Sequence, residues 1–243
     1  MRSIYWKEIH HFFSSLIGYM VVGGFLVLLG LMLWVFPDSN ILEGKFASLE
    51  GLFDTAPLVF LFLIPAITMR SFSEEQSSGT IELLITKPLK EWEIIVGKFL
   101  ACQTLILFAL LPTGLYYLTI YQLGSPPGNL DSGAIMGSYI GLFLLAACFN
   151  AVGIFASTLT KNQIVAFITA TFLCFFLHWG FSFVSRIPIF LGNLDNLIET
   201  LGIDFHYGSI SRGLIDSRDV IYFMSIIVFF LFMTLLRLER RKW

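Results

Sequence analysis

Six long apolar segments constrain this 243-residue chain more than any other feature of its sequence. A helix needs about 20 mostly apolar residues to cross a hydrocarbon core of roughly 30 Å. With 56% hydrophobic and 13% charged residues, the chain also has too little polar surface for a soluble fold of this size. We therefore predict an all-α polytopic membrane protein that forms a single transmembrane domain. The predicted spans are residues 17–36, 53–70, 99–121, 136–158, 164–185 and 219–236.

The second predicted span differs from the others because it contains two prolines, Pro57 and Pro65. Asp54 or Thr55 is expected to cap its start, which places Pro57 in the first turn, where its missing N–H costs little. The expected result is a short and kinked helix.

The distribution of Lys and Arg predicts how the spans are oriented, because cationic loops are retained on the cytoplasmic side. With both termini inside, 11 of the 15 Lys and Arg residues lie in the cytoplasm. The basic ending RLERRKW, residues 237–243, and Lys161 in a short loop agree with this orientation. The external cations are then Lys45, Arg186, Arg212 and Arg218.

Two segments outside the spans show amphipathic spacing. The external loop 186–218 is expected to hold a partly buried or interfacial helix in its first half, and residues 1–15 are expected to form a helix in the membrane interface.

The helix predicted over residues 1–15 contains two adjacent histidines, His10 and His11. Neighbours on a helix point about 100° apart, so this pair is not expected to bind a metal. The apolar side of residues 1–15 carries Ile4, Tyr5, Trp6, Ile9, Phe12 and Phe13.

The fourth span begins with Gly133, Gly137 and Gly141, which recur every four residues. This pattern lets two helix backbones approach closely, and packing inside the chain's own bundle is favoured over a subunit interface. Asn150 and His178 lie alone within spans, where each is expected to bond a neighbouring helix rather than a ligand.

Residues 70–98 form the only long polar stretch between two predicted spans, with four Lys or Arg and five Glu in 29 residues. Ser71 followed by Glu74 fits a capping box, and the SSGT at 77–80 favours a break in the helix. A second short helix over 81–87 must end before Pro88. We predict that the cytoplasmic loop 71–98 is a two-helix elbow, although a solvated loop whose charges only set the topology is the simpler alternative.

The elbow is expected to present both charge and apolar surface to a cytosolic partner. Leu83, Leu84 and Ile85 would supply an apolar knob. The acidic residues expected to face the partner are Glu74, Glu75, Glu82, Glu91 and Glu93.

The predicted spans contain no Asp, Glu, Lys or Arg in their interiors, unlike those of most proton- or sodium-driven transporters. If the protein transports a substrate, the energy for transport is therefore expected to come from outside the bilayer. The chain also lacks the G-x-x-x-x-G-K-[ST] loop that binds nucleotide phosphates, so an ATPase would have to be another polypeptide.

These features resemble the permease subunits of type-2 ABC exporters. In that family the first cytoplasmic loop reads as an acidic residue, a few polar residues, G-T-x-E-x-L-L and a proline. The outer segment 205–223, FHYGSISRGLIDSRDVIYF, also looks like a family feature. The resemblance covers nearly the whole chain and, within the family, is strongest to the permeases of gliding-motility ABC transporters of Bacteroidetes. The matching loop residues are Glu75, Gly79, Thr80, Glu82, Leu84 and Pro88, followed by Gly97 and Lys98.

The resemblance implies that the loop sits in a groove of a separate ABC ATPase subunit, which binds ATP and Mg, while this chain binds no cofactor and catalyses no reaction. It also implies a second permease copy or a related membrane subunit, membrane lipids around the spans, and a place in the bacterial inner membrane. No nucleic-acid partner is expected, because the Lys and Arg residues are scattered and form no basic face. The residues expected at the ATPase contact are Arg70, Glu74, Glu75, Gly79, Thr80, Glu82, Leu83, Leu84 and Pro88.

Two other classes of protein are alternatives, and the sequence hardly separates the first of them from a transporter. A membrane scaffold that assembles a motility or secretion complex would need the same bundle and docking loop. An intramembrane protease using Glu74 and Glu75 would need histidines and further ligands at membrane depth, where only His178 lies.

Overall fold

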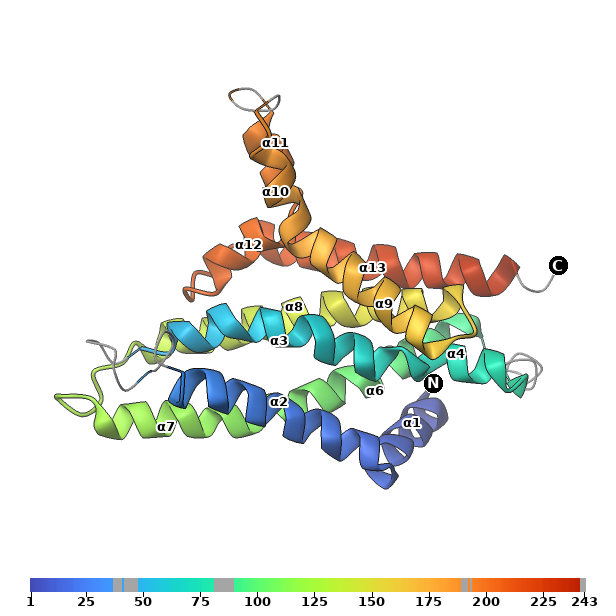
Figure 1. The fold of residues 1–243 in the computed structure, drawn as a ribbon, viewed down its shortest axis with the longest axis horizontal. Helices are drawn as coiled ribbons and strands as arrows, with labels where there is room; N and C mark the ends of the chain where they lie inside the picture. The colour runs from blue at the N-terminus through green and yellow to red at the C-terminus, as the bar shows by residue number, and fades with distance from the viewer. Residues whose placement is uncertain (37–40, 42–47, 81–89, 189–191, 193, 241–243) are drawn as a thin grey trace.

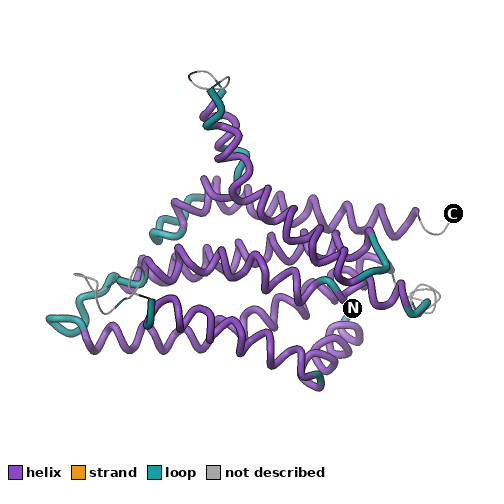
Figure 2. Tube along the Cα trace, in the orientation of Figure 1, coloured by secondary structure: helices purple, strands orange, loops and turns teal. Residues whose placement is uncertain are grey.

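The computed structural model describes residues 1–36, 41, 48–80, 90–188, 192 and 194–240, and every regular element in these ranges is a helix (Figure 2). Five helices are long and apolar enough to cross a membrane. The pair at the amino terminus, bent by 68°, would make a sixth. The predicted fold class, an all-α polytopic membrane protein, is confirmed.

The long helices lie roughly side by side, with their ends gathered at two opposite ends of the bundle (Figure 1). Short α1 and α4 lie at the same end as the last turn of α13. The long helices, with the short α1 and α4, are α1 Arg2–Ser14, α2 Leu16–Trp34, α3 Glu50–Thr68, α4 Arg70–Ser77, α6 Glu91–Leu110, α7 Gly114–Leu123, α8 Ser132–Leu159, α9 Gln163–Phe175 and α13 Ser217–Glu239. A 3₁₀ turn, Leu111–Thr113, joins α6 to α7.

Three short helices lie between α9 and α13, and the first of them completes the fifth span. A π-helical turn, Phe176–Gly180, joins α9 to α10 Phe181–Ser185, and α11 Asp195–Glu199 and α12 Ile203–Ile210 follow. α10 and α11 project from the bundle, whereas α12 returns to it (Figure 1). Leu194, Leu197 and Leu201 are exposed, while Ile203 is fully buried. A short helix, α11, is thus present where the amphipathic helix was predicted, but none of its residues is buried, and its place at a membrane interface stays a prediction.

Helix α8 is the most buried span and packs against α3, α9, α13 and α6. Its glycines permit close approach to the chain's own segments. A Cβ on Gly141 would lie 2.9 Å from Cβ of Ile210, and a Cβ on Gly137 would lie 2.7 Å from the carbonyl oxygen of Gly213. Gly133 faces only the capping carboxylate of Asp131.

The start of α3 differs from the prediction. The helix begins at Glu50, so neither Asp54 nor Thr55 caps it, and Pro57 and Pro65 both lie inside it. Pro57 has no N–H to donate to the carbonyl of Phe53, four residues earlier. The hydroxyl of Tyr207, in α12, donates to this Phe53 oxygen at 2.7 Å instead. A tertiary hydrogen bond therefore satisfies the carbonyl that the proline leaves free.

The third span also begins earlier than predicted, at Glu91 rather than at residue 99. The carboxylate of Glu93 accepts a hydrogen bond from the backbone N–H of Lys90 at 3.2 Å and so caps the helix start. As a result, Lys98 lies inside α6 with 2% of its side chain exposed. The prediction that no charged residue lies inside a spanning helix was therefore wrong.

Gly141→Ala should destabilise the bundle, because the added methyl group would overlap Ile210. Overpacking costs about 1–3 kcal/mol, more than the roughly 1 kcal/mol that alanine gains over glycine in a helix. Thermal unfolding in mild detergent measures the change. Gly24→Ala in α2 is the matched control, since nothing lies within 4 Å of its added Cβ. A Gly141→Ala protein as stable as this control would contradict the packing account.

Candidate functional site

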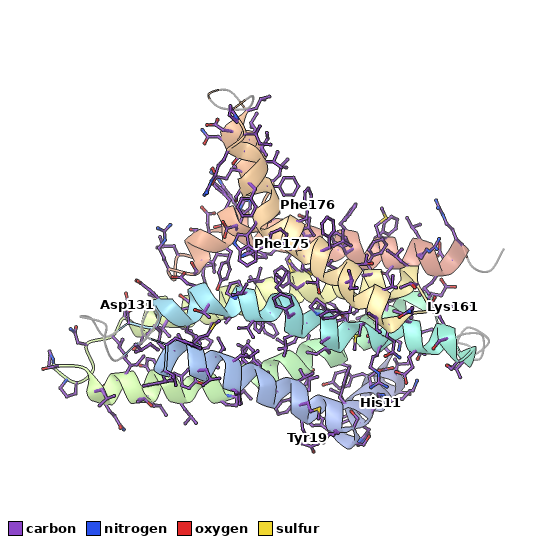
Figure 3. All side chains as sticks on the ribbon, viewed as in Figure 1. His11, Tyr19, Asp131, Lys161, Phe175 and Phe176 are labelled. Atoms are coloured by element: carbon purple, nitrogen blue, oxygen red, sulfur yellow. The ribbon has the colours of Figure 1, made fainter. Side chains whose placement is uncertain are left out.

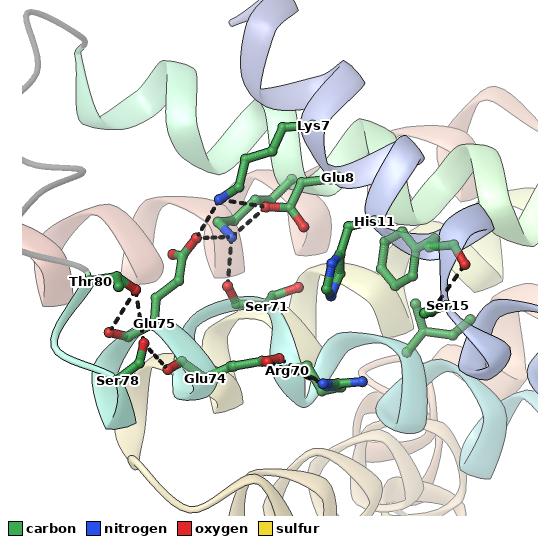
Figure 4. A pocket seen from close by; sticks show the side chains of 13 residues that line it. Lys7, Glu8, His11, Ser15, Arg70, Ser71, Glu74, Glu75, Ser78 and Thr80 are labelled. Atoms are coloured by element: carbon green, nitrogen blue, oxygen red, sulfur yellow. Dashed lines mark hydrogen bonds and ion pairs between the residues drawn. The ribbon is translucent and has the colours of Figure 1, made fainter.

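The polar stretch is anchored to the bundle by three charged side chains, the buried Glu8 and Lys98 and the largely buried Glu75, which we call the ionic junction. The Nζ atom of Lys98 lies 2.9 Å from a carboxylate oxygen of Glu8 and 3.0 Å from one of Glu75. It also donates to the carbonyl oxygen of Ser71 at 2.7 Å. Figure 4 shows Glu8 and Glu75 reaching from α1 and α4 toward this nitrogen. The junction therefore joins three helices that are distant in sequence.

Lys98 is fully satisfied in this position. An ammonium group has three N–H donors, and the three acceptors just described use all of them. Its Nζ also lies 5.1 Å from the centre of the Phe72 ring, within range of a cation–π interaction. A buried charge is tolerated only when it is paired and hydrogen-bonded, and both conditions hold for Lys98.

The packing of α1 on α6 brings Glu8 into reach. Ile4, Glu8 and Phe12 lie on the buried side of α1. Gly97 has no side chain to hold α1 away, and a Cβ there would lie 3.2 Å from the Ile4 side chain. The glycine next to Lys98 thus permits the short distance over which Glu8 and Lys98 pair.

At the rim of the junction, Lys7 adds a second cation. Its Nζ lies 3.3 Å from Glu75, and 60% of its side chain is exposed. Because solvent screens this pair, it contributes much less than the buried contacts of Lys98. With Lys7 included, the four side chains carry two positive and two negative formal charges and are balanced.

The local structure of α4 differs from the predicted capping box. The helix begins at Arg70 with no side-chain cap, and Ser71 is buried. Glu74 instead accepts two hydrogen bonds from the guanidinium of Arg70, at 2.9 and 3.1 Å. The carboxylate of Glu74 therefore pairs with the side chain of Arg70, four residues earlier on the same helix, instead of capping a backbone N–H.

The predicted break in the elbow is confirmed. Helix α4 ends at Ser77, and Gly79 has a φ of +71°, in the left-handed region that glycine adopts at little cost. The hydroxyl of Ser78 donates to the carbonyl oxygen of Glu74 at 2.8 Å. Residues 77–80 therefore stop the helix by the mechanism expected from their sequence.

A cavity of about 200 Å³ opens between α1 and α4 beside the junction (Figure 4). Figure 4 shows His11 of α1 directed toward α4 across this space. The cavity is lined by both acidic and basic side chains, among them Lys7, Glu8, His11, Arg70, Glu74, Glu75 and Lys98.

The predicted contact residues are distributed unevenly over this region. Glu75 has 13% of its side chain exposed and pairs inside the chain, whereas Gly79 and Thr80 are exposed. Glu91 and Glu93 lie in the first turn of α6. The rest, Glu82, Leu83, Leu84 and Pro88, lie outside the described residues, as do Ile85 and the second short helix predicted over 81–87.

The two polar residues noted within spans behave differently. As expected, Asn150 bonds a neighbouring helix, since its amide donates to the carbonyl of Phe99 at 3.0 Å and to the side chain of Gln103 at 3.1 Å. His178 forms no hydrogen bond in the described part of the chain, and its Nε2 lies 3.7 Å from the Asp204 carboxylate. Burial, with a further contribution from Glu199, raises the pKa of Asp204.

Sequence reasoning missed Glu8, Lys7 and Lys98 as members of this site. Glu8 interrupts the apolar side of α1 four residues after Ile4 and four before Phe12, which is a signal that a partner is needed. No sequence rule identifies that partner, because Lys98 is 90 residues away.

The fold and the junction define a helical membrane protein with a polar segment held at one end of its bundle. Comparison with protein families identifies the class further. Over residues 3–243 the chain matches the ABC-2 family transporter protein family, and it belongs to that family. It is therefore a membrane permease component of an ABC transporter, and its family implies an ABC ATPase partner. No match is found among curated proteins.

Lys98→Met should destabilise the protein strongly, because it puts an apolar side chain beside the carboxylates of Glu8 and Glu75 and leaves them only the largely exposed Lys7 as a cation. Breaking a buried ion pair from one side costs about 3–5 kcal/mol. Chemical unfolding in detergent measures this cost. Lys7→Met is the control and should cost less than about 1 kcal/mol, because Lys7 is largely exposed.

The triple variant Glu8→Gln, Glu75→Gln, Lys98→Met separates charge from packing. Because it removes the two carboxylates that lose their buried partner in Lys98→Met, it should recover most of the stability that Lys98→Met loses. A triple variant as unstable as Lys98→Met would show that the ion pairs are not the cause.

Proposed function

We propose that this chain couples ATP hydrolysis by a separate ATPase subunit to transport across the bacterial inner membrane. The observation that carries the proposal is the ionic junction. Residues 70–80 lead into the predicted ATPase contact, and α4 is tied through Lys98 to both α1 and α6. A displacement of this segment by a partner must therefore move three helices together.

The mechanism is a rigid-body switch. An ATPase that binds the segment 70–90 more tightly in one arrangement of the permease than in another shifts the population toward that arrangement. The contact is assigned to Arg70, Glu74, Gly79 and Thr80 with Glu82, Leu83, Leu84 and Pro88. Glu75, which pairs with Lys98, would transmit the displacement rather than form the outer contact.

A second permease subunit, either a copy of this chain or a related one, completes the proposed transporter. An open apolar groove of about 330 Å³ lies between the second and fifth spans, and its exposed side chains include Phe62, Ile168 and Phe172. We propose that these two spans, together with the first, line a pathway between the two permeases. The groove supports transport over the alternative function, a non-transporting membrane scaffold.

The physiological setting is proposed to be gliding motility, with this chain as a GldF-type permease of Bacteroidetes. The support is the pair of segments RSFSEEQSSGTIELLITKPL at 70–89 and DFHYGSISRGLIDSRD at 204–219. Deletion of the gene should abolish spreading on a surface while leaving growth in liquid unchanged; normal spreading would contradict this setting.

Both termini are proposed to be cytoplasmic, which places residues 124–131 outside. Alkaline phosphatase, which is active only outside the cytoplasm, should be inactive when fused after Trp243 and active when inserted after Gly128. The cationic residues near α4 and at the carboxyl terminus are the physical cause. The opposite pattern of activity would contradict this orientation, because it would place the proposed ATPase contact outside the cytoplasm.

Gly79→Pro should uncouple the ATPase. Proline fixes φ near −65°, which is incompatible with the +71° observed at Gly79, so the segment leading to the contact must change direction. In proteoliposomes containing the ATPase, we expect a loss of about tenfold in the permease-stimulated hydrolysis rate. Glu82→Lys should also lower stimulation, because it reverses a contact charge.

The matched control is Gly192→Pro. Gly192 also has a positive φ, +101°, and nothing lies within 4 Å of a Cβ added to either glycine. It lies in the loop between α10 and α11 and should leave stimulation unchanged. Normal stimulation with both Gly79→Pro and Glu82→Lys would contradict the proposed coupling.

A further inference from the structure

Two adjoining cavities lie where α3 and α8 begin and α12 ends, at the end of the bundle away from α4 (Figure 1). Figure 3 labels Asp131 at this end and Lys161 at the opposite one. The first cavity measures about 330 Å³ and is lined by Glu50, Asp54, Gly208, Ser211 and Arg212. The second, of about 230 Å³, shares Glu50, Ser211 and Arg212 and adds apolar walls from Leu49, Phe53, Leu130 and Ile135.

The turn that carries Arg212 is fixed to the bundle by buried contacts. The hydroxyl of Ser138, in α8, donates to the carbonyl oxygen of Ser211 at 2.7 Å. Gly213 has a φ of +84° and packs directly on Ala134, while Gly137 packs on Gly213. The glycine repeat of α8 thus holds this turn against the helix, and Arg212 projects from a backbone that is well constrained.

The charged side chains of the first cavity are not paired with one another. No carboxylate of the described residues lies within 4.0 Å of the Arg212 guanidinium, and neither Glu50 nor Asp54 forms an ion pair in this part of the chain. Glu50 and Asp54 are one turn apart on α3, so their carboxylates are neighbours. One cation and two anions therefore line the same space without neutralising each other.

We propose that these cavities bind a zwitterionic headgroup that carries a phosphate and a primary ammonium, such as phosphoethanolamine. Guanidinium groups bind phosphate with two parallel hydrogen bonds, which suits Arg212. A primary ammonium has three donors for the carboxylates of Glu50 and Asp54. The apolar walls of the second cavity accept the hydrocarbon attached to the phosphate.

The lining also predicts which headgroups are rejected. A trimethylammonium group donates no hydrogen bond and is usually bound by aromatic rings, which the first cavity lacks among its lining residues. An anionic headgroup such as phosphatidylglycerol leaves Glu50 and Asp54 without a partner and is repelled by them. The expected order of affinity is phosphatidylethanolamine over phosphatidylcholine and phosphatidylglycerol.

Native mass spectrometry of the purified full chain, incubated with equal amounts of these three phospholipids, tests the proposal. Phosphatidylethanolamine should be retained preferentially, and Arg212→Gln should weaken its retention about tenfold, the effect of losing a charged hydrogen bond. Glu50→Gln with Asp54→Asn should abolish the preference over phosphatidylglycerol. Displacement of the lipid by free O-phosphoethanolamine would identify the free headgroup, rather than the lipid, as a sufficient ligand.

Arg218→Gln is the matched control. Arg218 is exposed in the first turn of α13, at the same end of the bundle, and lines neither cavity. It should bind all three lipids as the native chain does, and the thermal unfolding of every variant is measured beside its binding. Equal retention of the three lipids by the native chain, or unchanged retention by a folded Arg212→Gln variant, would overturn the proposal.

Discussion

The dehydrated ammonium of Lys98 is the interaction on which the organisation of this permease depends most. A charge that loses its water must recover nearly all its hydrogen bonds from the protein, and Lys98 recovers three from three different places. The carboxylates of Glu8 and Glu75 and the carbonyl of Ser71 must therefore keep their positions. This requirement fixes α1, α4 and the start of α6 relative to one another more strictly than apolar packing does, because charged hydrogen bonds are directional.

Helix α8 connects this junction to the rest of the bundle. Near α4, the amide of Gln76 donates to the carbonyl of Thr158 at 3.2 Å, and Gly153 lets Thr68 pack on the α8 backbone. At the other end, Ser138 holds the Ser211 carbonyl and Gly141 receives Ile210. A single 28-residue helix thus contacts both the segment that leads to the proposed ATPase contact and the turn that carries Arg212. A displacement at one end of the bundle is therefore transmitted to the other end through the rigid helix α8.

The features that the sequence predicts correctly are those set by nearby residues. The spanning segments follow from the length of each apolar run, and the break at Ser78–Gly79 follows from a residue that tolerates positive φ. The start of α3 was not predictable, because the carbonyl of Phe53 that the internal Pro57 leaves free is satisfied by the hydroxyl of Tyr207, 150 residues after the proline. The predicted third span began after Lys98 for a similar reason. A charged residue is taken to end an apolar run when its partners are not known. Those partners come from α1 and α4, and no local pattern reveals the pairing.

The most direct test of the account is the distance between α1 and α4 in the membrane. Spin labels attached to Trp6→Cys and Ser77→Cys, both exposed positions, report this distance by pulsed electron paramagnetic resonance, and the native cysteines are all buried. The account predicts one narrow distance distribution in the otherwise native chain and a broad one when Lys98→Met is added while the helix content stays unchanged. Equally narrow distributions in the two proteins would show that the ionic junction does not fix α4 to α1.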